Sequence, residues 1–155
     1  MEDKNNLSQG LAGQDSRLHV CRCTTEADFC IGHGATSGSI AISSDSDLLI
    51  YPNVTSLVRP LPKKHHAYGI YEREQVLEAL GLPTPQHLVL YGIVTSNDYS
   101  NNIPGLGPVN NTDIIRSIDG NETVKKMLDK YILAAAAFAK PGVSVDAKMF
   151  QPSLR

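Results

Sequence analysis

One short apolar run followed by two acids restricts the fold of this chain more than any other stretch. Residues Ser39–Ile42 have the composition of a buried strand, and Ser43–Asp47 follow them directly. Carboxylates such as Asp45 and Asp47, two positions apart on extended backbone, point to the same face. At the carboxyl end of a strand in an α/β sheet, that face opens onto the ligand crevice. Because like charges repel, a metal site here would place a hard cation, Mg²⁺ or Mn²⁺, between the two carboxylates. A plain surface turn, in which serine and aspartate are common, is the favoured explanation of this stretch alone.

Length and composition fit a single folded domain. The chain has 155 residues, of which 41% are hydrophobic and 19% charged, enough to bury a core. A net charge of −2 gives no overall basic character, so nucleic-acid binding would depend on local patches. The first ten residues are polar, unlike a signal peptide, and the longest apolar run, 131–139, is too short to cross a bilayer. We therefore expect an intracellular protein without a membrane segment.

Local patterns predict strands and helices in alternation. We expect mostly parallel strands near 18–23, 39–43 and 57–61, with another short strand at 68–71. Glycine and proline boundaries predict helices at 25–32, 72–80, 87–95, 110–118 and 123–139. The expected organisation is a disordered lead-in over 1–18, a sheet region over 19–83, a helical part over 84–142 and a tail over 143–155. The predicted fold class is α/β.

Two further acidic signals stand on either side of the first. Glu26 and Asp28 open the helix predicted at 25–32, where Thr25 as N-cap and favourable helix-dipole interactions explain the acids structurally. Asp98 stands shortly before the hairpin Gly105-Leu106-Gly107. A Gly-x-Gly turn before a helix lets backbone amides approach a phosphate. A purely structural turn between helices is the alternative.

Three cysteines and a histidine form a C-x-C-x₆-C-x₂-H series, at Cys21, Cys23, Cys30 and His33. Thiolate and imidazole are zinc ligands, but this spacing matches none of the common structural zinc sites. Buried or incidental cysteines are the favoured explanation. A zinc-binding interaction protein is therefore the weakest of the hypotheses for this chain.

In their order, the three acidic signals resemble the motifs of the flap endonuclease (XPG-type) superfamily, a branch of the PIN-like nucleases. Glu26-Ala27-Asp28 resembles the family's E-A-[ED] helix motif, and the stretch from Ser43 resembles its [ST]-x-D-x-D-x-L strand motif. Asn97-Asp98-Tyr99, followed by Ile103–Gly107, resembles G-x-D-Y followed by I-x-G-[IL]-G. Each motif is weak alone, whereas the ordered set, covering roughly residues 20–120, is specific.

The resemblance implies a PIN-like parallel sheet flanked by helices, followed by a helix–hairpin–helix part. It implies that two Mg²⁺ or Mn²⁺ ions are bound by the carboxylates of Glu26, Asp28, Asp45, Asp47 and Asp98, which would make these the catalytic residues. The substrate would be DNA with a junction between duplex and single strand, cleaved by structure-specific hydrolysis during DNA repair in the nucleus. Gly105, Leu106 and Gly107 would grip the duplex backbone without reading bases.

Parts of the family pattern have no counterpart in this chain. The family's first strand, its acids and its basic arch are missing, and Asp3 and Asp15 lie in the polar lead-in. Val109-Asn110-Asn111 stand where the family has basic residues after the hairpin. We expect an N-terminally truncated, incomplete copy of such a nuclease, with a sheet edge exposed to self-association. The alternative is a non-catalytic remnant that binds nucleic acid or protein.

Overall fold

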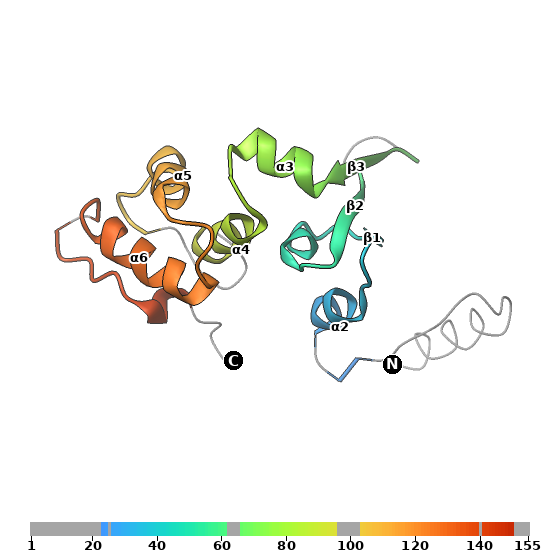
Figure 1. Ribbon diagram of the computed structural model, residues 1–155, viewed down its shortest axis with the longest axis horizontal. Helices are drawn as coiled ribbons and strands as arrows, with labels where there is room; N and C mark the ends of the chain where they lie inside the picture. Colours follow the sequence, from blue (N-terminus) through green and yellow to red (C-terminus); the bar gives the residue numbers. More distant parts are fainter. Residues whose placement is uncertain (1–22, 25, 62–65, 96–102, 140, 151–155) are drawn as a thin grey trace, which may run out of the picture.

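The computed structural model describes residues 23–24, 26–61, 66–95, 103–139 and 141–150 (Figure 1). Over these residues the chain is an α/β protein, as the sequence predicts. The elements, in chain order, are α2 (Ala27–Gly34), β1 (Ser39–Ile42), the 3₁₀ helix η1 (Asp47–Ile50), β2 (Val54–Pro60), β3 (Tyr68–Glu72), α3 (Arg73–Leu80), α4 (Pro85–Val94), α5 (Pro108–Ser117), α6 (Val124–Ala136) and the 3₁₀ helix η2 (Ala147–Phe150).

The sheet is mixed, so the predicted parallel sheet is wrong in part. Its strand order is β1-β2-β3; β1 runs parallel to β2, whereas β3 runs antiparallel to it. A parallel neighbour needs a long crossover connection, and the short connection from Leu61 to Ala67 allows only a hairpin. The strand expected near 18–23 lies, apart from Cys23, outside the described residues.

Glycine and proline set the helix boundaries close to where the sequence predicts them. α3 ends at Gly81, which adopts the left-handed conformation with φ 61°, the usual C-terminal stop. Pro85 and Pro108 are the first residues of α4 and α5, where the missing amide proton costs no helical hydrogen bond. The observed helices therefore start and end within a few residues of the predicted ones.

A single hydrophobic core joins the sheet to the helices. α4 contacts η1 on one side and α5 and α6 on the other, and α3 contacts β2 and β3 (Figure 1). The largest fully buried side chains come from both parts, and include Leu48, Leu57, Leu90, Ile115, Met127 and Tyr131. No helix in the described part of the chain is long and apolar enough to cross a membrane. The division of the chain near residue 83 stays a prediction.

Two buried polar side chains fix the helical part. His87 is 1% exposed; its Nδ1 lies 2.8 Å from the Thr84 hydroxyl and its Nε2 2.9 Å from the Ile118 carbonyl. Asn111 is equally buried, and its side-chain carbonyl accepts a hydrogen bond from the Tyr131 hydroxyl. Burial raises the pKa of Tyr131 to about 12. Both side chains thus have their polar groups satisfied inside the core.

Candidate acidic site

The two aspartates after β1 lie in a turn, which confirms the surface-turn explanation, whereas the extended backbone assumed for a metal site is wrong here. The Ser43 amide still donates to the Val58 carbonyl, at 3.1 Å, which continues the β1–β2 pairing. The Asp45 amide then donates to the Ser43 hydroxyl at 3.0 Å, and the Asp47 amide to Asp45 Oδ1 at 2.9 Å. Ser46 has helical dihedrals, and Asp47 begins η1. Serine and aspartate side chains therefore fold this segment by bonding backbone amides two residues ahead.

Arg73 holds the connection between β1 and β2 in place. Its guanidinium group donates to the carbonyls of Leu49, Tyr51, Pro52 and Val54, at 3.2 Å for Leu49 and 2.8 Å for Pro52. Burial lowers the pKa of Arg73, but a guanidinium stays charged in proteins. Sequence reasoning missed this residue. The available signal was a cation at the first position of a helix, where acids are favoured.

Helix α2 begins at Ala27 with Glu26 as its N-cap, whereas the sequence predicts Thr25, which lies outside the described residues. The helix lies against the ring of Tyr51 at Gly32. A Cβ atom at position 32 would lie 2.2 Å from Tyr51 Cδ1, so glycine is needed for this close approach. The contact brings the start of α2 towards the turn after β1.

The acids of α2 and of the turn affect one another electrostatically. The pKa of Asp28 is raised, first by burial, then by a hydrogen bond with Asp45, and further by the negative charges of Asp45, Glu26 and Asp47. The pKa of Tyr51 is raised by burial and then by the same four acids. Four of the five predicted site residues therefore lie in one neighbourhood, although two come from a helix start and two from a turn.

The acids that the structure describes do not form a complete set of metal ligands. Among the residues that the structure describes, no three His, Cys, Asp or Glu side chains lie close enough together to hold one metal ion. Asp28 and Asp45 approach as a pair, and a cation beside them would lower the raised pKa of Asp28. Asp98 lies outside the described residues. Metal binding by the five acids stays a prediction.

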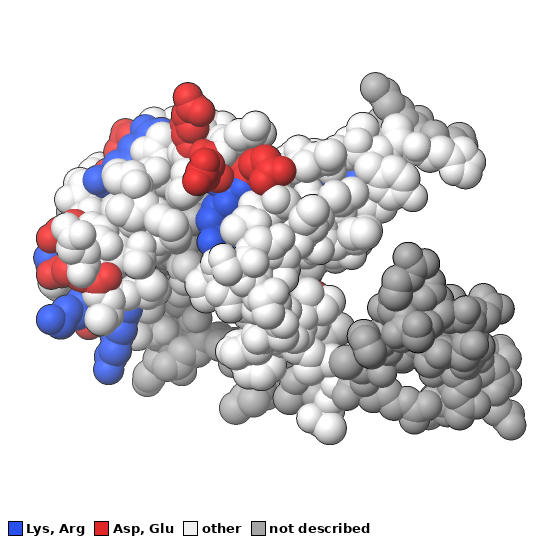
Figure 2. All heavy atoms as spheres, turned by 45° about the vertical axis from the view of Figure 1, so that its right-hand side comes forward, with Lys and Arg blue, Asp and Glu red and all other residues white. Residues whose placement is uncertain are grey.

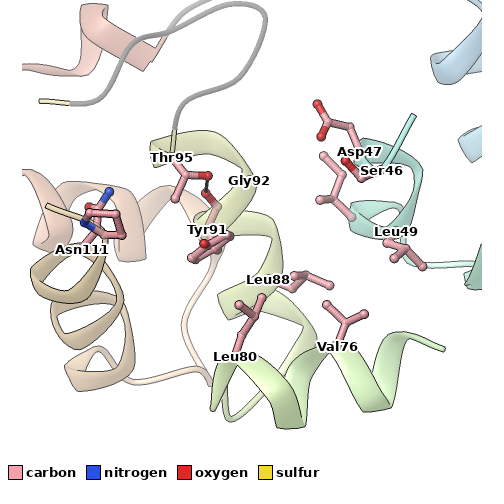
Figure 3. A pocket seen from close by; sticks show the side chains of 12 residues that line it. Ser46, Asp47, Leu49, Val76, Leu80, Leu88, Tyr91, Gly92, Thr95 and Asn111 are labelled. Carbon is pink, nitrogen blue, oxygen red and sulfur yellow. Dashed lines mark hydrogen bonds between the residues drawn. The ribbon is translucent and has the colours of Figure 1, made fainter. Parts of the chain in front are cut away.

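A pocket of about 420 Å³ adjoins the acidic turn. It lies between η1, α3, α4 and α5, and its apolar wall includes Leu49, Val76 and Leu88, while Ser46 and Asp47 lie along one side (Figure 3). Figure 2 shows acidic and basic side chains next to each other over the helices, with a broad uncharged surface on the rest of that face. Ser46 and Asp47 therefore border a cavity that separates the turn from helices α3, α4 and α5.

The predicted hairpin is a tight turn at the start of α5. Gly105 has φ 99°, a conformation that favours glycine, and the Leu106 amide donates to the Ile103 carbonyl at 3.0 Å. The Leu106 side chain is buried, so only its backbone can contact a ligand. Gly107 is the N-cap of α5, and a Cβ atom there would meet nothing within 4 Å. The segment between α4 and this turn, 96–102, is outside the described residues, so a helix–hairpin–helix unit stays a prediction.

The described residues of the zinc hypothesis do not form a metal site. Cys23 and Cys30 are thiols rather than halves of a disulfide. The His33 ring lies 3.9 Å from that of Phe29, and its Nδ1 lies 3.0 Å from the Phe29 carbonyl. Cys23, Cys30 and His33 form no metal-holding group within the described part of the chain, and Cys21 lies outside it.

Comparison with known proteins gives one relationship. No protein-family model matches the chain. The chain is 28% identical, over 132 residues, to a protein named Flap endonuclease 1 from Glossina morsitans morsitans. The similar region covers 76% of this chain and 33% of that protein, so the chain spans about a third of the length of the relative. This similarity supports a flap endonuclease-like relationship and nothing more specific.

Proposed function

We propose that this chain acts on DNA as a structure-specific, divalent-metal-dependent endonuclease of the flap endonuclease type. The observation that carries the proposal is the meeting of acids from two separate motifs, where burial and then the neighbouring acids raise the pKa of Asp28. Perturbed carboxylates gathered at one place are typical of functional sites. The relative named Flap endonuclease 1 supports the same reaction class. The substrate proposed is DNA with a junction between duplex and single strand, met during repair in the nucleus.

The acids are proposed to hold one or two Mg²⁺ or Mn²⁺ ions. Asp45 Oδ1 accepts the Asp47 amide at 2.9 Å, which fixes the rotation of the Asp45 carboxyl group beside Asp28. Glu26 and Asp47 lie within electrostatic reach, and Asp98 is proposed to join them. When bound, such ions activate a water molecule and stabilise the leaving oxygen in phosphodiester hydrolysis. The protein's part is to hold the carboxylates oriented and close together, while the bound cation favours their ionised form.

The turn at 105–107 is proposed to contact the duplex backbone. Its positive-φ Gly105 and the open space around Gly107 leave room for a phosphate near the first amides of α5. Because Leu106 is buried, this contact uses main-chain groups alone and reads no bases. Val109 and Asn110 follow on the exposed surface, without a lysine or arginine, so the grip on the phosphate should be weak.

The alternative function is a non-catalytic module that binds nucleic acid or a protein partner. It requires no metal ligands, and no three ligand side chains converge within the described residues. Two-metal hydrolysis needs both ions held at fixed positions, which two approaching carboxylates alone do not provide. The two functions differ in one measurable respect, since only the enzyme cuts a flap.

Calorimetric titration with Mn²⁺ tests the metal site. We expect wild type to bind and the double variant Asp45→Asn/Asp47→Asn to lose most of the affinity. Asp113→Asn/Asp129→Asn is the matched control, because it removes the same charge from exposed positions on α5 and α6 and should bind as wild type does. Equal binding by wild type and the Asp45/Asp47 variant would refute the site.

Cleavage of a labelled flap substrate with Mg²⁺ separates the enzyme from the alternative. If the proposed function holds, the purified 155-residue chain should cut the flap substrate near its junction when Mg²⁺ is present. Robust cutting that Asp47→Ala abolishes would establish the enzyme. Flap binding that Mn²⁺ strengthens, without cutting, would favour the non-catalytic module.

A further inference from the structure

Within the part of the chain that the structure describes, strand β1 has one unpaired backbone edge. It is the end strand of the sheet and pairs only with β2 among the described residues (Figure 1). The Ser43 amide bonds to the β2 carbonyl of Val58, and in a parallel ladder every second residue faces the neighbour. Ala41 therefore faces β2, whereas the amide and carbonyl groups of Ile40 and Ile42 point away from the sheet.

The side chains along this edge are apolar and exposed. Ile40 is 63% exposed and Ile42 is 75% exposed. The strand Ser39–Ile42 contains no charged residue and no proline, the devices by which natural edge strands avoid pairing. A hollow of about 480 Å³ lies beside it, lined by Cys30 and Ile31 of α2 and by Ile40. Both the backbone and the space beside it therefore suit an added strand.

We propose that β1 pairs with β1 of a second copy of this chain, antiparallel about a two-fold axis at Ala41. In this register Ile40 lies opposite Ile42 of the other copy, and Ile42 lies opposite Ile40. The register keeps the isoleucines on the exposed face and Ala41 on the buried face. The outward amides and carbonyls of Ile40 and Ile42 then form the hydrogen-bonded pairs. The two sheets become one continuous sheet.

The strand itself favours a second copy over other partners. Ile40-Ala41-Ile42 reads the same in both directions, so antiparallel pairing is self-complementary, as a two-fold interface requires. The absence of charge on β1 avoids repulsion between copies that each carry a net charge of −2. Antiparallel pairing also places the two acidic turns at opposite ends of the joined sheet. The turns take no part in the pairing, so the proposed dimer does not depend on the proposed nuclease function.

Sedimentation equilibrium of the full chain tests the pairing. We expect the mass to rise with concentration from 16.8 kDa towards twice that value. Ile42→Lys should weaken association by about tenfold or more, because two symmetric isoleucine pairs are lost and charge is placed on the edge. Ile70→Lys is the matched control: Ile70 is 66% exposed on β3, at the opposite edge, and its variant should associate as wild type does.

Cysteine cross-linking tests the register. In a background with Cys21, Cys23 and Cys30 replaced by serine, a mixture of Ile40→Cys and Ile42→Cys chains should form a disulfide-linked dimer. Opposite Cα atoms in such a pair lie about 5.5 Å apart, within disulfide range. Either variant alone should cross-link poorly, because each cysteine then faces an isoleucine. The proposal would be overturned by a monomer at all concentrations or by large aggregates in place of a dimer. It would also be overturned if the two lysine variants had equal effects, or if each cysteine variant alone cross-linked as well as the mixture does.

Discussion

Replacing Arg73 with alanine should destabilise the connection that carries the acidic turn. The guanidinium group of Arg73 is the shared donor for four backbone carbonyls, those of Leu49, Tyr51, Pro52 and Val54. Alanine removes every one of these hydrogen bonds and leaves the acceptors without that partner. We therefore expect a lower free energy of unfolding and a less ordered segment between β1 and β2.

The size of the loss follows from the burial of the acceptors. Three of the four hydrogen bonds are partly buried and the one to Pro52 is exposed. A hydrogen bond to a charged group contributes about 1.5–3 kcal/mol, but bonds that share one donor group are not additive and exposed carbonyls regain water. About 1 kcal/mol for each partly buried bond gives a loss of about 3 kcal/mol for Arg73→Ala. Arg73→Lys should recover only about 1 kcal/mol, because a compact ammonium cannot span the acceptors.

Urea denaturation followed by far-UV circular dichroism measures these losses by linear extrapolation. Arg116→Ala is the matched control, since Arg116 also donates to two carbonyls, those of Leu80 and Gly81, but in exposed positions. Its loss should stay below about 1 kcal/mol. If Arg73→Ala costs no more than Arg116→Ala, the role assigned to Arg73 is wrong.

Three further changes test the surroundings of the site. Gly32→Ala should lower the free energy of unfolding by about 1–3 kcal/mol in thermal denaturation, because its Cβ would lie 2.2 Å from the Tyr51 ring. Gly34→Ala, whose Cβ would meet nothing within 4 Å, should be nearly neutral. Equal effects of the two variants would contradict the packing of Gly32 against Tyr51. The raised pKa of Asp28 means that its ionisation lowers the free energy of unfolding. Wild type should therefore lose stability relative to Asp28→Asn as the pH rises above the ordinary aspartate pKa of 3.8. A stability difference that does not change with pH in urea titrations would exclude this. Gly107→Val should lower duplex affinity in gel-shift titrations more than it lowers stability in urea, since a Cβ atom there meets nothing within 4 Å. Unchanged binding would make the turn purely structural.

Local rules were enough to predict most of the helices and the first pair of strands. The stop at Gly81 and the starts near Pro85 and Pro108 depend on single residues whose backbone preferences are strong. The connection between β1 and β2, which contains η1, is long enough to allow their parallel pairing. The direction of β3 was open to the same reasoning, because its short connection to β2 requires a hairpin.

The geometry of the candidate site depends on contacts that no single pattern reports. The turn at Asp45 and Asp47 forms because short polar side chains compete with the strand for backbone amides. The approach of Asp28 depends on Gly32 lying against Tyr51, and these residues belong to different elements. The sequence indicated which acids belong together through a family resemblance, whereas their positions are set by tertiary packing.

The closeness of Glu26, Asp28, Asp45 and Asp47 is more easily explained by a bound ligand than by a contribution to the stability of the fold. Asparagine at position 28 would keep the shape of the side chain and remove both the burial of a charge and the repulsion that raise the pKa of Asp28, so a purely structural role would favour the neutral residue. A bound divalent cation reverses this balance, because it stabilises the ionised form and with it the folded state. The two effects are therefore linked: on the proposed function, Asp28→Asn should be the more stable protein without metal and should lose the stabilisation that Mn²⁺ gives to wild type. An Asp28→Asn variant that gains as much from Mn²⁺ as wild type does would show that the repulsion has no connection with metal binding.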